Sequence, residues 1–209
     1  MNQKDKTTEE KILDAANKIF VEKGLDGTRM QEIADEAKMN KSLLHYYYRS
    51  KEKLFSEVFN RVIKTFLPNT IKIFDTDKSL FEKIEIFVSE YISLLEKNPF
   101  IPMFVLHELS KKPTKIADTF SEFFSSLKNN QLEKIKTQIQ IEIQKGTIRP
   151  IGVEQIIVNI LSLCIFPFAA KPIIAKLFFD DDKKNYKNFI EERKTEVADF
   201  VIQSIRIKN

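Results

Sequence analysis

Residues 41–46 carry polar side chains at a spacing that suits contact with DNA. If a helix begins after Asn40, five of these side chains point outward or lie at its edge: Lys41, Ser42, Leu43, His45 and Tyr46. A lysine can meet a phosphate, and serine, histidine and tyrosine can hydrogen-bond to base edges or phosphates. A leucine can touch a thymine methyl group. This stretch therefore predicts a surface that recognises nucleic acid.

Two short helices joined by a tight turn are expected to present that surface. Thr28 is a predicted N-cap, with Gln31 three residues on as in a capping box. Residues 38–40 are too few to be anything but a turn, and Asn40 can cap the second helix. The inner side of that helix is predicted to carry Leu44, Tyr47 and Tyr48. This arrangement predicts a helix-turn-helix whose second helix lies in the major groove.

The charge of the chain is concentrated around the same stretch. Between Lys38 and Lys53 there are five basic residues and one acidic residue, and this local excess of +4 equals the formal net charge of the whole chain. Lys51 and Arg49 are further candidates for phosphate contact, and Lys51 is expected to open the next helix, where backbone N–H groups also favour anions.

The region resembles the N-terminal DNA-binding domain of the TetR family of bacterial transcriptional repressors. The resemblance covers KILDAANKIFVEKGLDGTRMQEIADEAKMNKSLLHYYYRSKEKLF, about a fifth of the chain. The family usually has glycine where this chain has Lys38, and a left-handed lysine costs about 1 kcal/mol, so a differently shaped turn is expected. The usual Tyr-His pair appears as His45-Tyr46. The residues expected to contact DNA are Thr28, Arg29, Gln31, Asn40, Lys41, Ser42, Leu43, His45, Tyr46 and Lys51.

The resemblance implies a sequence-specific regulator that binds a near-palindromic operator on double-stranded DNA as a homodimer. In the family, a small molecule bound by the body of the protein moves the two DNA-binding heads apart and releases DNA. Residues 1–50 are accordingly expected to form the helix-turn-helix domain, and residues 51–209 a helical ligand-binding and dimerisation domain. Repression is expected, although activation stays open, because its sign depends on where the operator lies relative to the promoter.

Composition excludes several other classes of protein. The four glycines rule out dinucleotide-binding and P-loop phosphate motifs, and the two histidines lie far apart, which argues against a zinc site. No cofactor or metal is therefore expected. A single cysteine fits a reducing cytoplasm. The longest uncharged run, Gln155–Ala170, is shorter than the roughly 20 residues of a membrane span, and no membrane segment or signal region is expected.

An all-α fold of about nine helices is predicted, because apolar residues recur at helical spacing and no strand-like alternation is present. Val153–Phe179 is apolar on more than one face and is interrupted by Pro167 and Pro172. This helix and the terminal helix, about residues 183–207, are the expected dimer interface, as two pairs in a four-helix bundle. The alternative is that both helices only close the core of one monomer.

A small hydrophobic ligand is compatible with the body. The residues expected to line its cavity are mainly apolar, as such sites usually are: Phe100, Phe104, His107, Phe120, Phe124, Cys164, Phe166 and Phe168. The alternative is that these phenylalanines are ordinary core residues.

Two other functions compete with a regulator. An enzyme would need convergent catalytic groups, and the only local pair, His107 and Glu108, does not share a helix face. The chain is therefore not expected to be an enzyme. A helical adaptor that has kept the fold without specific DNA binding is the other alternative, and Lys38 in the turn favours it.

Overall fold

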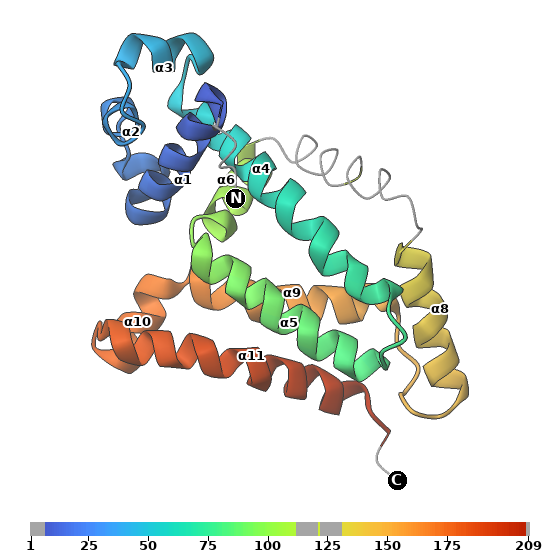
Figure 1. Cartoon of the computed structure of the whole chain (residues 1–209). Coiled ribbons are helices and arrows are strands. Elements are labelled where there is room, and N and C mark those ends of the chain that lie inside the picture. Colours follow the sequence, from blue (N-terminus) through green and yellow to red (C-terminus); the bar gives the residue numbers. More distant parts are fainter. Residues whose placement is uncertain (1–6, 112–120, 122–130, 208–209) are drawn as a thin grey trace, which may run out of the picture. The chain divides into compact units, whose positions relative to one another are not determined.

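The computed structural model describes residues 7–111, 121 and 131–207. Within these ranges it contains ten α-helices, and the only extended pairing is a single bridge between Ile148 and Arg206. The elements in order are α1 (Thr8–Gly27), α2 (Met30–Glu36), α3 (Lys41–Tyr47), α4 (Lys51–Ile71), the 3-10 helix η1 (Lys72–Asp75), α5 (Leu80–Lys97), α6 (Ile101–Lys111), α8 (Gln131–Gln144), α9 (Val153–Ala169), α10 (Lys171–Phe179) and α11 (Lys183–Ile205) (Figure 1). The predicted all-α fold is confirmed.

The chain divides into two compact units. The first contains residues 1–66 and 98–101, and the second contains residues 67–97 and 102–209. The first unit extends beyond residue 50, where the sequence placed a boundary. The physical reason is that the first half of α4 is buried with α1: Leu54, Phe55, Val58 and Phe59 are each at most 2% exposed.

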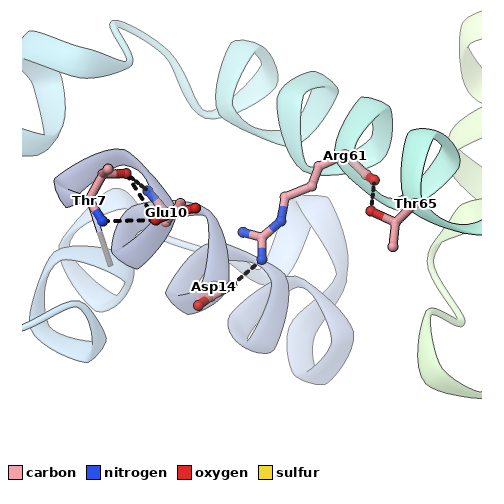
Figure 2. Close-up of polar contacts among 5 residues, drawn as sticks. All are labelled: Thr7, Glu10, Asp14, Arg61 and Thr65. Atoms are coloured by element: carbon pink, nitrogen blue, oxygen red, sulfur yellow. Dashed lines mark hydrogen bonds and ion pairs between the residues drawn. The ribbon is translucent and has the colours of Figure 1, made fainter. Parts of the chain in front are cut away.

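Helix α1 forms much of the buried core of the first unit. It begins with a capping box, in which the Glu10 N–H donates to the Thr7 hydroxyl at 3.2 Å and the Thr7 N–H donates to the Glu10 carboxylate at 2.8 Å (Figure 2). Its inner face is buried: Ile12, Ala15, Ala16, Ile19 and Phe20. The Phe20 ring meets the Phe55 ring edge-on at 4.6 Å, and an Asp14–Arg61 ion pair also joins α1 to α4 (Figure 2).

Helices α5, α9 and α11 pack against one another in the second unit. Their buried residues repeat at helical spacing, as Ile84, Val88 and Ile92 do on α5. The predicted interruption of the Val153–Phe179 helix is confirmed, because α9 and α10 meet at Ala170 with a bend of 73°. Among the described helices, none alone is long and apolar enough to cross a membrane, and only the bent α9–α10 pair passes that test when taken together.

Side chains of α11 satisfy the carbonyl groups that this bend leaves open. Pro167 lies inside α9 and has no N–H, so the Leu163 carbonyl lacks its usual helical donor. Arg193 supplies one, donating from Nη2 at 2.7 Å. The Pro167 carbonyl, in the last turn of α9, accepts from the buried Tyr186 hydroxyl at 2.9 Å. Helix α11 therefore stabilises the α9–α10 bend by hydrogen bonding as well as by packing.

Replacing Tyr186 with phenylalanine tests this role. Y186F leaves the Pro167 carbonyl buried without its donor, which should lower the free energy of unfolding by about 1–2 kcal/mol. Urea unfolding followed by circular dichroism measures the change. Tyr46 is 81% exposed and provides the matched control, since Y46F removes a hydroxyl that water can replace. Equal stability of Y186F and Y46F would contradict the role given to Tyr186.

Candidate nucleic-acid interface

The turn between α2 and α3 is a Schellman motif with a lysine in its left-handed position. The Met39 N–H donates to the Ala34 carbonyl at 2.9 Å, and the Lys38 N–H donates to the Asp35 carbonyl at 3.0 Å. Lys38 has φ 55°, the region where glycine is least strained. The turn thus has the left-handed residue that a glycine at this position would supply, and the differently shaped turn expected from Lys38 is not found. The substitution is accommodated as backbone strain.

Helix α2 begins one residue later than the sequence predicted. Its N-cap is Arg29, whose N–H donates to the Glu32 carboxylate at 2.9 Å. Thr28 is 2% exposed, and its hydroxyl donates to the Gly24 carbonyl at 2.6 Å. The predicted Thr28–Gln31 capping box is therefore wrong, because α1 bends at Gly24 (φ 68°) and its open carbonyl takes the Thr28 hydroxyl. Gln31 is exposed and donates to Asp35 at 2.7 Å.

Helix α3 is capped and anchored largely as predicted. The Asn40 side chain accepts from the Leu43 N–H at 2.7 Å. Leu44 is fully buried and Tyr48 is 4% exposed, whereas Tyr47 is 39% exposed, so its prediction as an inner residue is wrong. Tyr47 is the last residue of a seven-residue helix, and its ring meets the exposed Tyr46 ring edge-on at 5.6 Å instead of entering the core.

Tyr48 ties the end of α3 to the start of α1. Its hydroxyl donates to the Glu9 carboxylate at 2.9 Å. Burial raises the pKa of Tyr48, and the hydrogen bond to Glu9 acts in the same direction. The phenol therefore stays a neutral donor at physiological pH.

The outward side of α3 is open to solvent. All five residues predicted to face outward or lie at the helix edge are exposed: Lys41, Ser42, Leu43, His45 and Tyr46. Tyr46 projects farthest into solvent, at 81% exposure, and Leu43 at the edge is 38% exposed. A short, capped helix thus presents a cation, three hydrogen-bonding side chains and an apolar contact on one side. This is the chemistry that phosphate and base-edge contact requires.

Lys51 has an intramolecular role that sequence analysis missed. Its ammonium donates to the Thr28 carbonyl at 3.1 Å and lies 3.5 Å from the Asp26 carbonyl. It therefore ties the start of α4 to the segment between α1 and α2. The sequence signal was Gly24, since a bend before the end of a helix leaves carbonyls open for a donor. Ser50 caps α4, accepting from the Lys53 N–H at 3.1 Å.

Two ion pairs hold α2 on α1. Lys18 meets Glu36 at 2.8 Å, and Lys23 meets Glu32 at 2.7 Å. The hydrogen bond from Lys23, followed by the one from the Arg29 N–H, lowers the pKa of Glu32. Both pairs are exposed and contribute little to stability, but they restrict how α2 can rotate against α1. Sequence spacing alone could not reveal them, because the partners come from different helices.

The structure distributes the residues predicted to line a ligand cavity over both units. Phe100 is 7% exposed in the first unit, where its ring lies 5.1 Å from that of Phe55. Cys164 and Phe168 are buried in the second unit, and Phe166 is 64% exposed on α9. Phe104 and His107 belong to α6, but the structure does not describe their side chains. Phe120 and Phe124 lie outside the described residues.

Comparison with protein families supports the helix-turn-helix assignment. Residues 12–58 match the family model described as bacterial regulatory proteins, tetR family. This match covers the chain from α1 into α4, which is the part that builds and supports the exposed side of α3.

Similarity to known proteins extends over the whole chain. The probable HTH-type transcriptional regulator YttP of Bacillus subtilis is 25% identical over 198 residues, which is 90% of this chain and 91% of that protein. IcaR of Staphylococcus epidermidis, a negative transcriptional regulator of the biofilm operon icaADBC, is 26% identical over 55% of this chain and 68% of its own length. The ketosteroid transcriptional regulator KstR2 of Mycobacterium tuberculosis has the same fold, with a TM-score of 0.66 at 16% identity over 99% of this chain and 98% of that chain.

Replacing Lys38 with glycine tests the strain in the turn. A left-handed lysine costs about 1–2 kcal/mol, and part of this is offset by the greater freedom of glycine in the unfolded chain. K38G should therefore raise the free energy of unfolding by about 0.5–1 kcal/mol. Chemical unfolding measures the change, and K38A is the control, because it removes the charge but keeps the Cβ atom. An equal gain in K38A would show that charge, and not backbone strain, is responsible.

Proposed function

Because this chain belongs to the TetR family of bacterial transcriptional regulators, we propose that it is a repressor that binds a near-palindromic operator as a homodimer. Regulators of this family bind DNA and work as dimers, and they are not enzymes. The observation that carries the proposal is the exposed polar side of α3, held by a capped turn and a buried inner face. Repression is the proposed sign, because the staphylococcal relative is named as a negative regulator.

The side chains of α3 divide into two proposed roles. Lys41, in the first turn, contacts a phosphate and sets affinity. Ser42, His45 and Tyr46 lie closer to the bases and set sequence preference. Lys51 stabilises the first unit through its hydrogen bond to the Thr28 carbonyl. Its ammonium could contact a phosphate only if that hydrogen bond were broken. Because Lys38 takes the left-handed conformation that the helix-turn-helix needs, its presence in the turn no longer favours an adaptor role.

Helices α9, α10 and α11 are the proposed dimer interface. Large apolar side chains are exposed on all three, each between 57% and 68%: Val158, Phe166, Ile173, Leu177, Phe178 and Phe200. Monomeric proteins rarely leave so many large apolar groups in water on adjacent elements. A two-fold pairing of identical surfaces would cover them and would place two recognition helices for two half-sites.

A small hydrophobic ligand in the second unit is the proposed signal for release. Cys164 is fully buried and Phe168 is 8% exposed, and burial raises the pKa of the Cys164 thiol to about 12, so the thiol itself is neutral. Together with Phe104, His107, Phe120 and Phe124 they are the proposed lining, which favours an apolar ligand. Release requires the ligand to bind the two conformations of the protein unequally.

Substitutions on α3 test the two proposed roles against an operator obtained by random-sequence selection. K41A should weaken binding to all sequences about tenfold and reduce the salt dependence, lowering the log–log slope by about 1 per protomer. H45A should instead relax sequence preference by about 1–3 kcal/mol at one base position. K145A, on the exposed end segment after α8, is the control and should change neither quantity. An unchanged slope in K41A, or equal loss on every sequence in H45A, would reject the assigned role.

A charge placed in the proposed dimer interface should separate the protomers. Phe200 is 65% exposed on α11, and F200E would bury a carboxylate without a partner in a dimer, raising the dimer dissociation constant at least about tenfold. Sedimentation velocity across a concentration series measures the constant. I141E alters a 42% exposed isoleucine of α8, outside the proposed interface, and should leave the constant unchanged. A dimer in F200E as stable as in the wild type would place the interface elsewhere.

A further inference from the structure

Lys83 is a buried lysine in a part of the second unit that the proposed function does not yet use. It lies on α5 and is 5% exposed. Its ammonium donates to the Gln138 side-chain oxygen of α8 at 2.9 Å and lies 3.5 Å from the Phe74 carbonyl of η1. Burial lowers the pKa of Lys83, while Asp77 and Asp75 raise it and Lys134 lowers it further. A methionine of similar volume would avoid this desolvation cost.

Gln138 and Lys134 extend the contact from α8 to the segment that follows α4. The Gln138 amide donates to the Lys78 carbonyl at 3.2 Å, so one side chain joins α8 to both Lys83 and the loop before α5. Lys134 meets Asp75 of η1 at 2.5 Å. Within residues 133–144 of α8, only Ile139 is buried. The position of α8 on η1 therefore depends mainly on polar contacts, which are directional and specify one arrangement.

The place of η1 in the chain gives this cluster a connection to DNA binding. Helix α4 begins in the first unit, where Lys51 is bonded to the Thr28 carbonyl, and it continues to Ile71 in the second unit. Lys72, the first residue of η1, follows with no residue between. A displacement of η1 therefore acts directly on the end of α4, the helix whose first residue, Lys51, bonds to the Thr28 carbonyl of the first unit.

We propose that Lys83 is a positioning residue for DNA binding, which with Gln138 fixes η1 on α8 and so holds the end of α4 in the operator-binding arrangement. The inference rests on the proposed function, and it adds residues that touch neither DNA nor a ligand. A rearrangement of α8 would break three directional contacts, one each to η1, to the loop before α5 and to Lys83 of α5. The buried charge makes this arrangement selective, because a shifted α8 would leave the ammonium without its acceptor.

Four variants test the proposal by operator binding, well below their unfolding temperatures. K83M and Q138L each remove one partner and should weaken operator binding on the order of tenfold, within the range of long-range coupling. The double variant should lose less than the sum of the two single losses, because both changes break the contact that Lys83 and Gln138 share. Q138E keeps an acceptor for the ammonium but loses the donor to the Lys78 carbonyl, so its loss of operator binding should be clearly smaller than that of Q138L. K136M, on the exposed side of α8, is the matched control.

Hydrogen exchange measured without DNA reports on the cluster itself. Exchange in residues 72–79 should rise in K83M and Q138L, rise less in Q138E, and stay at the wild-type level in K136M. Affinity for non-specific DNA, which depends on the cations of the first unit, should not change in any variant.

The outcomes separate this inference from the proposed function. Wild-type operator affinity in folded K83M and Q138L, even with reduced stability, would reduce Lys83 to a structural residue and overturn the inference. Loss in Q138E as large as in Q138L would also overturn it. If the wild-type chain has no preference for any DNA sequence, the proposed function is overturned, and so is the role of Lys83 in operator binding. If hydrogen exchange in residues 72–79 is unchanged in K83M, the role of Lys83 in fixing η1 on α8 is overturned.

Discussion

A helix of seven residues is too short to be stable in water, and this constraint governs the arrangement around α3. Its backbone is held at one end by the Asn40 cap and at the other by Tyr48, whose buried hydroxyl bonds to Glu9. Leu44, fully buried, fastens the middle. Helices α1, α2 and α4 thus hold α3 so that its outward side stays exposed. The ion pairs between α1 and α2 restrict rotation of α2 against α1.

Side-chain donors satisfy carbonyl groups at two breaks in regular helix. At the bend in α1, the Gly24 carbonyl accepts from the Thr28 hydroxyl, and the Thr28 carbonyl after the helix accepts from Lys51. Pro167 leaves the Leu163 carbonyl without a helical donor, and Arg193 donates to it. These donors cost little where they are partly exposed, but they decide how the elements on either side of a break are oriented. The orientation of α3 and of the apolar residues of α9–α11 therefore depends on a few hydrogen bonds as much as on packing.

Local patterns predicted the parts of the fold that depend on near neighbours. The Asn40 cap, the burial of Leu44 and the break between α9 and α10 are all set by residues a few positions apart. Partners distant in sequence escaped prediction: Lys51 bonds to the Thr28 carbonyl, and Phe100 packs on Phe55 of α4. Spacing shows which side chains share a helix face, and it does not show what that face meets. DNA contact, the dimer interface and the ligand remain predictions for the same reason.

The most direct test is fluorescence-anisotropy binding to the DNA that flanks the protein's own gene, against scrambled DNA of equal length, at two salt concentrations. A sequence-specific dimeric regulator should bind the flanking DNA more tightly than the scrambled DNA, by at least about a thousandfold at physiological salt. Both affinities should fall as salt rises. Equal, weak binding to both DNAs, followed by failure of random-sequence selection to enrich any site, would contradict the account and leave the exposed side of α3 as a solvated helix face.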